Sequence, residues 1–361
     1  MMTNARWTLW LLAAAVLVML FAGCGESPEP AAEGGPDPAE EAATNVASGP
    51  ATDRKIITLC YHAMADASGS TYEIAIGDFR EQLAALAEEG YQSVLPSQIA
   101  DYFEGKADLP EKAVCITFDD GPESVLTVSK PAMDAHGYVG AAFLIADSVG
   151  SGGNLTWDQV GELEAAGWEI GSHTALHEKA TKVDDATCEA EFAGSREKIA
   201  AEIEGDCAAL AYPFGLYDAS VIEHAREAGY RIAFTIDRGP ADQTTDAMLA
   251  PRQILVDGNS LETFRGWLAQ EKLHLEEITP AIGERMASGQ TITARLADEG
   301  VPAEGLEISV NGNVVKNEAG AGSGMLRISP ELDEGANNLR INYYGDPRRE
   351  VSWVIVTKSG S

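Results

Sequence analysis

The sequence predicts an α/β protein: a distorted (β/α) barrel of about seven strands, followed by a small all-β, immunoglobulin-like sandwich. Three observations lead to this fold class. Apolar runs alternate with helical patterns as far as about residue 272, and several helical patterns end at a glycine. Beyond that point, short alternating strands are separated by Gly, Asn and Pro turns. Strand and helix in alternation indicate a parallel sheet, which seven strands can close into a barrel.

The expected elements follow from hydrophobic periodicity. Seven apolar runs are the expected barrel strands: 56–62, 91–95, 113–119, 140–146, 168–173, 209–214 and 231–236. Helices are expected between most of them, for example over 76–89, 126–136 and 218–228. The later region has expected strands at 290–297, 306–310, 337–344 and 351–357.

Two adjacent acids follow the apolar run that ends at Phe118. Asp119 and Asp120, with the Gly-Pro pair after them, stop that run where a strand becomes a loop. In α/β barrels the reacting groups gather at the carboxyl ends of the strands. Asp-Asp-Gly alone is an ordinary turn, so these acids indicate a site only together with a second motif at another strand end.

The second motif is a pair of histidines after the run at 168–173. His173 and His177 are four residues apart, close enough to share one cation if the loop turns helically. With Asp120 they offer one carboxylate and two imidazoles, and such a set leaves coordination positions open for water or substrate. Two imidazoles favour Zn²⁺, while mixed nitrogen and oxygen ligands also suit Co²⁺, Ni²⁺ or Mn²⁺.

These segments resemble the polysaccharide deacetylase family, the NodB-like carbohydrate esterases, whose pattern is T-F-D-D-G followed by H-[ST]-x-x-H. Residues 117–121 and 173–177 carry the match, and the resemblance covers about residues 54–272. Residues 211–218 resemble the third motif in the Y-P-[YF]-G form of the biofilm poly-β-1,6-N-acetylglucosamine deacetylases. The resemblance implies an irregular barrel and metal-dependent hydrolysis of N-acetyl groups on an N-acetylglucosamine polysaccharide.

The chain departs from the family pattern in two places. Ala211 stands where many relatives have an arginine, and residues 263–268 contain no counterpart of the late Leu-x-His motif. Arg252 follows a proline, as an arginine often does in the biofilm branch, so it is the candidate to hold Asp119 ionised and oriented. A surface arginine after a turn is the competing interpretation, and Asp237 after the seventh strand is a further candidate.

The resemblance also implies roles in the reaction. The metal would activate a bound water and polarise the acetamide carbonyl, and Asp119 would take the proton of the attacking water. The oxyanion would be shared between the metal and the backbone N–H of Phe214. The side chains of Tyr212 and Phe214 are themselves expected to be plain core aromatics.

The proton donor to the leaving amine has to come from outside the missing late motif. Beyond the two metal ligands, His136 and His224 lie in helices expected outside the barrel, and His274 starts the linker to the β region. His62 ends the first strand at the same rim as Asp119, and its Tyr-His pair resembles one in the biofilm branch. His62 is therefore the expected general acid, and a histidine that only caps the strand is the alternative.

The first 23 residues are expected to be a lipoprotein signal peptide. Arg6 precedes an apolar core over 7–21 that is too short to span a bilayer comfortably, and small residues stand before Cys24. Phe21 departs from a typical lipobox, where leucine is usual. We expect Cys24 to carry a lipid that anchors an exported protein in the bacterial cell envelope, and a secretory signal cut elsewhere is the alternative.

Composition predicts the remaining organisation. Residues 24–53 are rich in Ala, Pro, Gly and Glu and predict a disordered acidic tether, before a deacetylase domain at 54–272 and a β-sandwich domain at 273–361. The net charge of −32 argues against nucleic acid as a partner. Cys60 and Cys115 fall in apolar strands and are expected to be buried thiols rather than a disulfide.

Together these observations predict a lipid-anchored, metal-dependent polysaccharide N-deacetylase. Two alternatives from other classes remain. A catalytically inactive glycan-binding protein would be expected to lose the metal ligands or the base, and here all four residues are present. An envelope assembly lipoprotein, in which the β region acts, is the other alternative.

Overall fold

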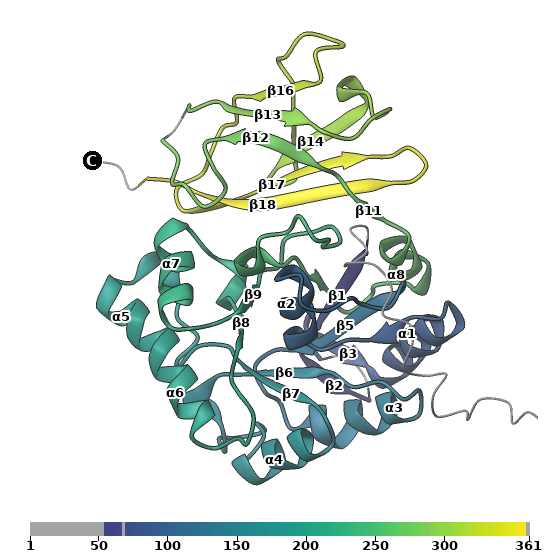
Figure 1. The fold of residues 1–361 in the computed structure, drawn as a ribbon, viewed down its shortest axis with the longest axis vertical. Helices are drawn as coiled ribbons and strands as arrows, with labels where there is room; N and C mark the ends of the chain where they lie inside the picture. Colours follow the sequence, from purple (N-terminus) through teal and green to yellow (C-terminus); the bar gives the residue numbers. More distant parts are fainter. Residues whose placement is uncertain (1–53, 67–68, 288, 359–361) are drawn as a thin grey trace, which may run out of the picture. The chain divides into compact units, whose positions relative to one another are not determined.

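The computed structural model describes residues 54–66, 69–287 and 289–358. All of them belong to one compact unit, which contains a parallel barrel sheet, a two-stranded sheet and two further β-sheets (Figure 1). The expected signal peptide, the tether and Cys24 lie outside the described residues. Among the helices of the described ranges, none is long and apolar enough to cross a membrane.

The barrel sheet has eight parallel strands. Seven lie side by side in the order β10-β1-β5-β6-β7-β8-β9, and β4 (Gln92–Ser93) pairs with the start of β5 (Ala113–Phe118). The other members are β1 (Ile56–Tyr61), β6 (Ala141–Leu144), β7 (Glu169–Ser172), β8 (Ala209–Ala211), β9 (Ile232–Phe234) and β10 (Gln253–Ile254). The predicted parallel α/β architecture is confirmed.

The sheet nearly closes through the chain that follows β9. Phe234 forms a parallel bridge with Ala250, and β10 then pairs with β1 through Leu59 and Cys60. Each predicted apolar run contains one strand, but β10 was not predicted. A strand of two residues is too short to produce a period-two pattern and depends on its pairing with β1.

Helices connect most of the strands. They are α1 (Ile76–Glu88), α2 (Pro96–Phe103), α3 (Lys130–Asp134), α4 (Trp157–Ala165), α5 (Asp185–Glu189), α6 (Ser195–Ala200), α7 (Ala219–Glu227) and α8 (Leu261–Leu268). A short parallel pair, β2 (Ala63–Ala65) and β3 (Glu73–Ala75), follows β1.

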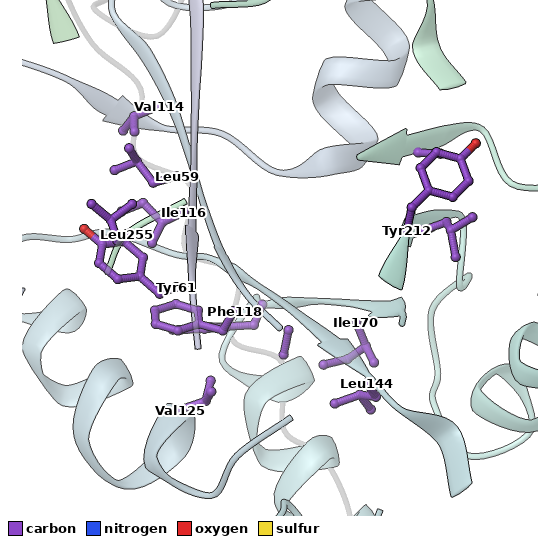
Figure 2. Close-up of a cluster of buried hydrophobic side chains, with 14 of the residues drawn as sticks. Leu59, Tyr61, Val114, Ile116, Phe118, Val125, Leu144, Ile170, Tyr212 and Leu255 are labelled. Atoms are coloured by element: carbon purple, nitrogen blue, oxygen red, sulfur yellow. The ribbon is translucent and has the colours of Figure 1, made fainter. Parts of the chain in front are cut away.

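Alternation along the strands separates two cores. Leu59 and Tyr61 of β1 belong to the cluster that packs under the helices, together with Val114, Ile116 and Phe118 of β5 (Figure 2). A second cluster collects small and aromatic side chains from opposite strands of the sheet and therefore fills the barrel interior: among its members are Ile56, Ala113, Cys115, Phe143, Ala209, Ala211 and Phe234. Because side chains alternate, Asp119 continues the interior series that begins at Ala113.

Gly171 in β7 makes room for the interior side chain of Phe143. A Cβ atom built on it would lie 2.5 Å from ring atoms of Phe143 and 3.0 Å from the carbonyl oxygen of Ala209. No real Cβ tolerates the first of these distances, so Phe143 can occupy the interior only because residue 171 lacks a side chain.

The chain after β10 builds two further sheets. One contains β11 (Glu271–Lys272), β18 (Arg349–Val356), β17 (Ala336–Tyr343), β14 (Leu306–Val310) and β15 (Asn313–Val315) in that order. The other contains β12 (Leu275–Thr279), β13 (Ile292–Leu296) and β16 (Met325–Ile328). One apolar cluster takes side chains from both sheets. A two-sheet β region is thus present, while its likeness to an immunoglobulin domain stays a prediction.

The four cysteines of the described ranges are free and buried. Cys60 and Cys115 lie on the adjacent strands β1 and β5, but Cys60 is opposite Thr117 and Cys115 is opposite Thr58. The expectation of buried thiols is confirmed for both.

Candidate metal and catalytic site

Asp119 is held by a buried arginine. Its carboxylate accepts two hydrogen bonds of 2.7 Å from the two terminal nitrogens of Arg252, one to each oxygen, and the exposed fractions of the two side chains are 3% and 0%. Burial opposes ionisation of the carboxyl, but the facing Arg252, followed by His173, outweighs it and holds the pKa of Asp119 below its usual range. Asp119 is therefore an ionised acceptor at neutral pH.

Arg252 itself lies in the barrel interior. Its Nε donates to the carbonyl oxygen of Thr235, and one terminal nitrogen also donates to Thr117 Oγ1. The guanidinium carbon lies 5.6 Å from the ring centroid of Phe143 and 5.9 Å from that of Phe234. Bidentate pairing and aromatic stacking suit the planar guanidinium better than an ammonium. The alternative of a surface arginine is wrong, because Arg252 is fully buried.

Asp120, His173 and His177 bring one ligand atom each to a common point. Asp120 Oδ1 lies 3.6 Å from His173 Nε2 and 3.8 Å from His177 Nε2, and the two imidazole nitrogens are 3.1 Å apart. Two nitrogens bound to Zn²⁺ at about 2.0–2.1 Å in a tetrahedron would be about 3.3 Å apart. Asp120 Oδ1 is buried without a hydrogen-bond partner in the described ranges, as expected for a ligand oxygen. The arrangement fits a divalent metal.

The surroundings of His173 favour the ligating form of its ring. Its Nδ1 lies 2.8 Å from the carbonyl oxygen of Ala211, which can only accept, so Nδ1 carries the proton and Nε2 keeps its lone pair. Burial, in opposition to Asp119, lowers the pKa of His173. A neutral imidazole with a free Nε2 is what a metal requires.

Backbone strain is concentrated at this site. Six residues other than glycine have a positive φ in the described ranges, and four of them lie here: Asp120 (68°), Thr174 (66°), His177 (63°) and Phe214 (58°). A left-handed backbone is costly for such residues and persists where the surroundings impose it, most often at functional sites. The turn at Asp120 also explains how its carboxylate joins the two histidines while that of its neighbour Asp119 faces Arg252.

Comparison with known proteins agrees with this geometry. Residues 106–233 match the family model described as polysaccharide deacetylase. This part of the chain is similar to a polysaccharide deacetylase domain. The match includes Asp119, Asp120, His173, His177 and the third-motif residue Phe214.

Curated relatives and solved structures extend the likeness beyond residues 106–233. A putative polysaccharide deacetylase of Bacillus subtilis, YxkH, is 25% identical over 218 residues, which are 60% of this chain and 77% of YxkH. The poly-β-1,6-N-acetyl-D-glucosamine N-deacetylase of Escherichia coli K12 is 26% identical over 289 residues, 67% of this chain but 42% of that protein. The IcaB structure from Ammonifex degensii has a TM-score of 0.54 at 27% identity and covers 60% of this chain and 98% of IcaB.

His62 follows strand β1 at the rim of the barrel, close to Asp119. A ring nitrogen of His62, Cys60 Sγ and a carboxylate oxygen of Asp119 lie within 4.8 Å of one another. His62 Nδ1 is buried without a partner in the described ranges, and the centroid of its ring lies 4.9 Å from that of Tyr72, with the two planes tilted by 33°. The structure thus brings His62 to the predicted place, whereas His136, His224 and His274 lie elsewhere in the fold.

Phe214 corrects one expectation. Its side chain is 48% exposed, not part of the core, and its ring centroid lies 4.5 Å from that of His177. Tyr212 is fully buried as expected. The left-handed φ of Phe214 turns its side chain out of the core and leaves an exposed aromatic surface beside His177.

Cys60 is the residue that sequence reasoning missed. Its thiol donates to Asp119 Oδ2 at 3.4 Å, and burial raises its pKa, so it stays protonated. The alternation of side chains along a strand could have predicted this contact, because Cys60 and His62 are two residues apart and therefore lie on the same face of the strand. That face is the barrel interior, which Asp119 also faces. Asp237, the other candidate to orient the base, instead accepts a hydrogen bond from Tyr217.

Proposed function

We propose that this protein is a metal-dependent N-deacetylase of an N-acetylglucosamine polysaccharide. One observation carries the proposal: a three-atom metal cluster of Asp120, His173 and His177 lies beside a buried, ionised Asp119. A divalent cation next to a charged acceptor is the arrangement needed to hydrolyse an amide with water. The deacetylase match and the relative named a poly-β-1,6-N-acetyl-D-glucosamine N-deacetylase support this substrate class.

The residues have distinct tasks in this proposal. Asp120 Oδ1 and the Nε2 atoms of His173 and His177 hold the metal, which would supply a water of lowered pKa and a Lewis acid. Zn²⁺ suits the two imidazoles, and Co²⁺, Ni²⁺ or Mn²⁺ would also suit the mixed set. Asp119 accepts a proton from the attacking water, and Arg252 keeps that carboxylate charged and fixed through both of its oxygens.

The second half of the reaction needs a proton on nitrogen. When the amide C–N bond breaks, acetate leaves and the sugar amine must gain a proton. His62 is the imidazole near Asp119 that is not a metal ligand, so it is the proposed donor. The backbone N–H of Phe214 is the proposed donor to the oxyanion, as the family resemblance implies.

The proposed location is the bacterial cell envelope. The support is the apolar segment over 7–21 that ends in small residues before Cys24, followed by a tether without Lys or Arg. A lipid on Cys24 would keep the domain beside an envelope polymer. Mass spectrometry of the mature N-terminus should find acyl chains on Cys24, and an unmodified N-terminus would contradict the anchor.

Acetate release tests the proposed activity. The protein should release acetate from β-1,6-linked N-acetylglucosamine oligomers faster than from β-1,4-linked oligomers or peptidoglycan. The release should stop on chelation and return when Zn²⁺ is added. His173→Ala should be inactive, and His224→Ala, a matched change on helix α7, should retain activity. Absence of release from all three substrates, or release insensitive to chelation and to His173→Ala, would contradict the proposal.

A further inference from the structure

A cavity lies apart from the proposed catalytic site. Its volume is about 510 Å³, which is within the range of small-ligand sites. The loop after β9, strand β12 and the first half of β18 contribute its walls, whereas Asp119 and the three proposed metal ligands do not. The cavity therefore belongs to the contact between the barrel and the C-terminal sheets.

Asp237 provides an unsatisfied acceptor on the wall of this cavity. The side chain is 4% exposed, and Tyr217 donates a hydrogen bond of 2.7 Å to its Oδ2. Its Oδ1 has no partner in the described part of the chain. A buried carboxyl oxygen without a donor costs on the order of 1–3 kcal/mol, so such an atom calls for a ligand or water.

Arg238 provides the complementary donors. Its backbone N–H donates to Ser352 Oγ, but its half-buried guanidinium makes no hydrogen bond or ion pair with the described residues. The other charged side chains of the wall are all engaged, in the pairs Lys272–Asp242, His274–Asp242, Asp246–Arg226, Glu276–Arg295, Glu277–Arg295 and Glu350–Arg340. Arg238 is thus the cation of the wall without an ion pair to the described residues, and Asp237 Oδ1 and Glu350 Oε1 are buried carboxylate oxygens of the wall without a hydrogen-bond donor there.

The presence of both an acceptor and a donor on the wall indicates which class of ligand the cavity can bind. A cation would satisfy Asp237 and leave Arg238 without a partner, and an anion would do the reverse. Hydroxyl groups donate and accept, so a sugar can satisfy both while its apolar faces meet Trp353 and Ile278 on the same walls. We propose that this cavity is a non-catalytic binding site for a short oligosaccharide. The site is argued without the proposed activity, but the choice of N-acetylglucosamine as the probe rests on it.

Two variants remove the site in different ways. Arg238→Gln removes the charged donors. Ala281→Trp fills the cavity from an exposed position on its wall, so its large side chain does not have to enter the core. Ala287→Trp is the matched control, because Ala287 is exposed in the same segment between β12 and β13 and does not line the cavity. Equal thermal midpoints of the variants and the parent protein would show that all are folded.

Calorimetric titration of the metal-free, full-length protein with the β-1,6-linked N-acetylglucosamine disaccharide measures the binding. We expect two binding events in the parent protein and in Ala287→Trp, and at least tenfold weaker binding of one of them in Ala281→Trp and Arg238→Gln. Acetate release by metal-loaded Ala281→Trp should stay within twofold of the parent protein.

The outcomes separate the two proposals. A single event that neither variant weakens overturns the cavity site. Binding of glycine, an amino acid with both charges, in place of the disaccharide overturns the assignment to carbohydrate. If no acetate is released but Ala281→Trp still abolishes a binding event, the cavity site stands and the proposed activity fails.

Discussion

Replacing Arg252 with methionine should affect both stability and activity. The methionine roughly fills the space of the arginine stem but removes both 2.7 Å bonds to Asp119 and the bond to the Thr235 carbonyl. The carboxylate then stays buried with only the weak thiol donor of Cys60 at 3.4 Å. Loss of one partner of a buried ion pair typically costs about 3–5 kcal/mol. Total stabilities of about 5–15 kcal/mol allow the variant to remain folded.

Arg231 offers a matched control at the protein surface. It forms ion pairs of 2.6 Å with Asp101 and 2.9 Å with Glu104, yet its side chain is 32% exposed. Solvent screening reduces such pairs to about 0–1 kcal/mol. Urea unfolding should therefore give a free energy of unfolding about 3–5 kcal/mol lower for Arg252→Met and nearly unchanged for Arg231→Met.

Activity supplies the second readout for the Arg252 variant. Acetate release at a temperature where the variant is folded should fall at least about 100-fold, because Asp119 loses the group that keeps it charged and oriented. Metal content should not change, since no bond joins Arg252 to Asp120, His173 or His177 among the described contacts. Equal losses of stability in Arg252→Met and Arg231→Met, together with wild-type acetate release, would refute the reasoning.

Three further predictions concern other parts of the fold. His62→Ala should keep its metal and lower acetate release about 10²–10⁴-fold, and wild-type turnover with full metal content would exclude it as the proton donor. Gly171→Val should lower the free energy of unfolding by about 1–3 kcal/mol, because any side chain there displaces Phe143, and an unchanged urea midpoint would contradict this. Burial raises the pKa of Asp237 from its ordinary value of 3.8 to about 7 in the folded protein. Between about pH 4 and 7 the folded protein therefore holds a proton that the unfolded chain has released, and the free energy of unfolding falls as pH rises through that window. Asp237→Asn should abolish up to about 4 kcal/mol of this fall, and equal pH profiles of the two proteins would count against it.

Much of the fold was predictable because the strands carry a simple pattern. Both faces of most barrel strands are buried, which gives apolar runs, and seven such runs each contain one strand. β4 is the exception, because Gln92 is exposed. β10 was not predictable, since a pair of residues has no periodicity of its own and forms through contact with β1. β11, which also has two residues, was not predicted for the same reason.

The residues of the site also differ in how far the sequence alone could predict them. The carboxylates and imidazoles were identified because each follows a strand in a recognisable motif. Arg252 was identified as the candidate partner of Asp119 only through the resemblance to the biofilm branch, because the two residues are distant in sequence. The chain path that brings Ala250 beside Phe234 places it in the barrel interior. The exposure of Phe214 was mispredicted, because hydrophobicity argues for burial and does not reveal a left-handed backbone. Cys60 was missed because a cysteine in an apolar strand usually packs as a small hydrophobe.

The central claim is that two neighbouring aspartates have different tasks, and a pair of isosteric variants tests it most directly. Metal-to-protein ratio and acetate release are measured for Asp119→Asn and Asp120→Asn, with thermal midpoints to confirm folding. Asp119→Asn should retain the metal and lose acetate release, because its carboxylate faces Arg252. Asp120→Asn should lose both, because its Oδ1 completes the cluster with His173 and His177. A metal-free Asp119→Asn, or a fully loaded and active Asp120→Asn, would contradict the account.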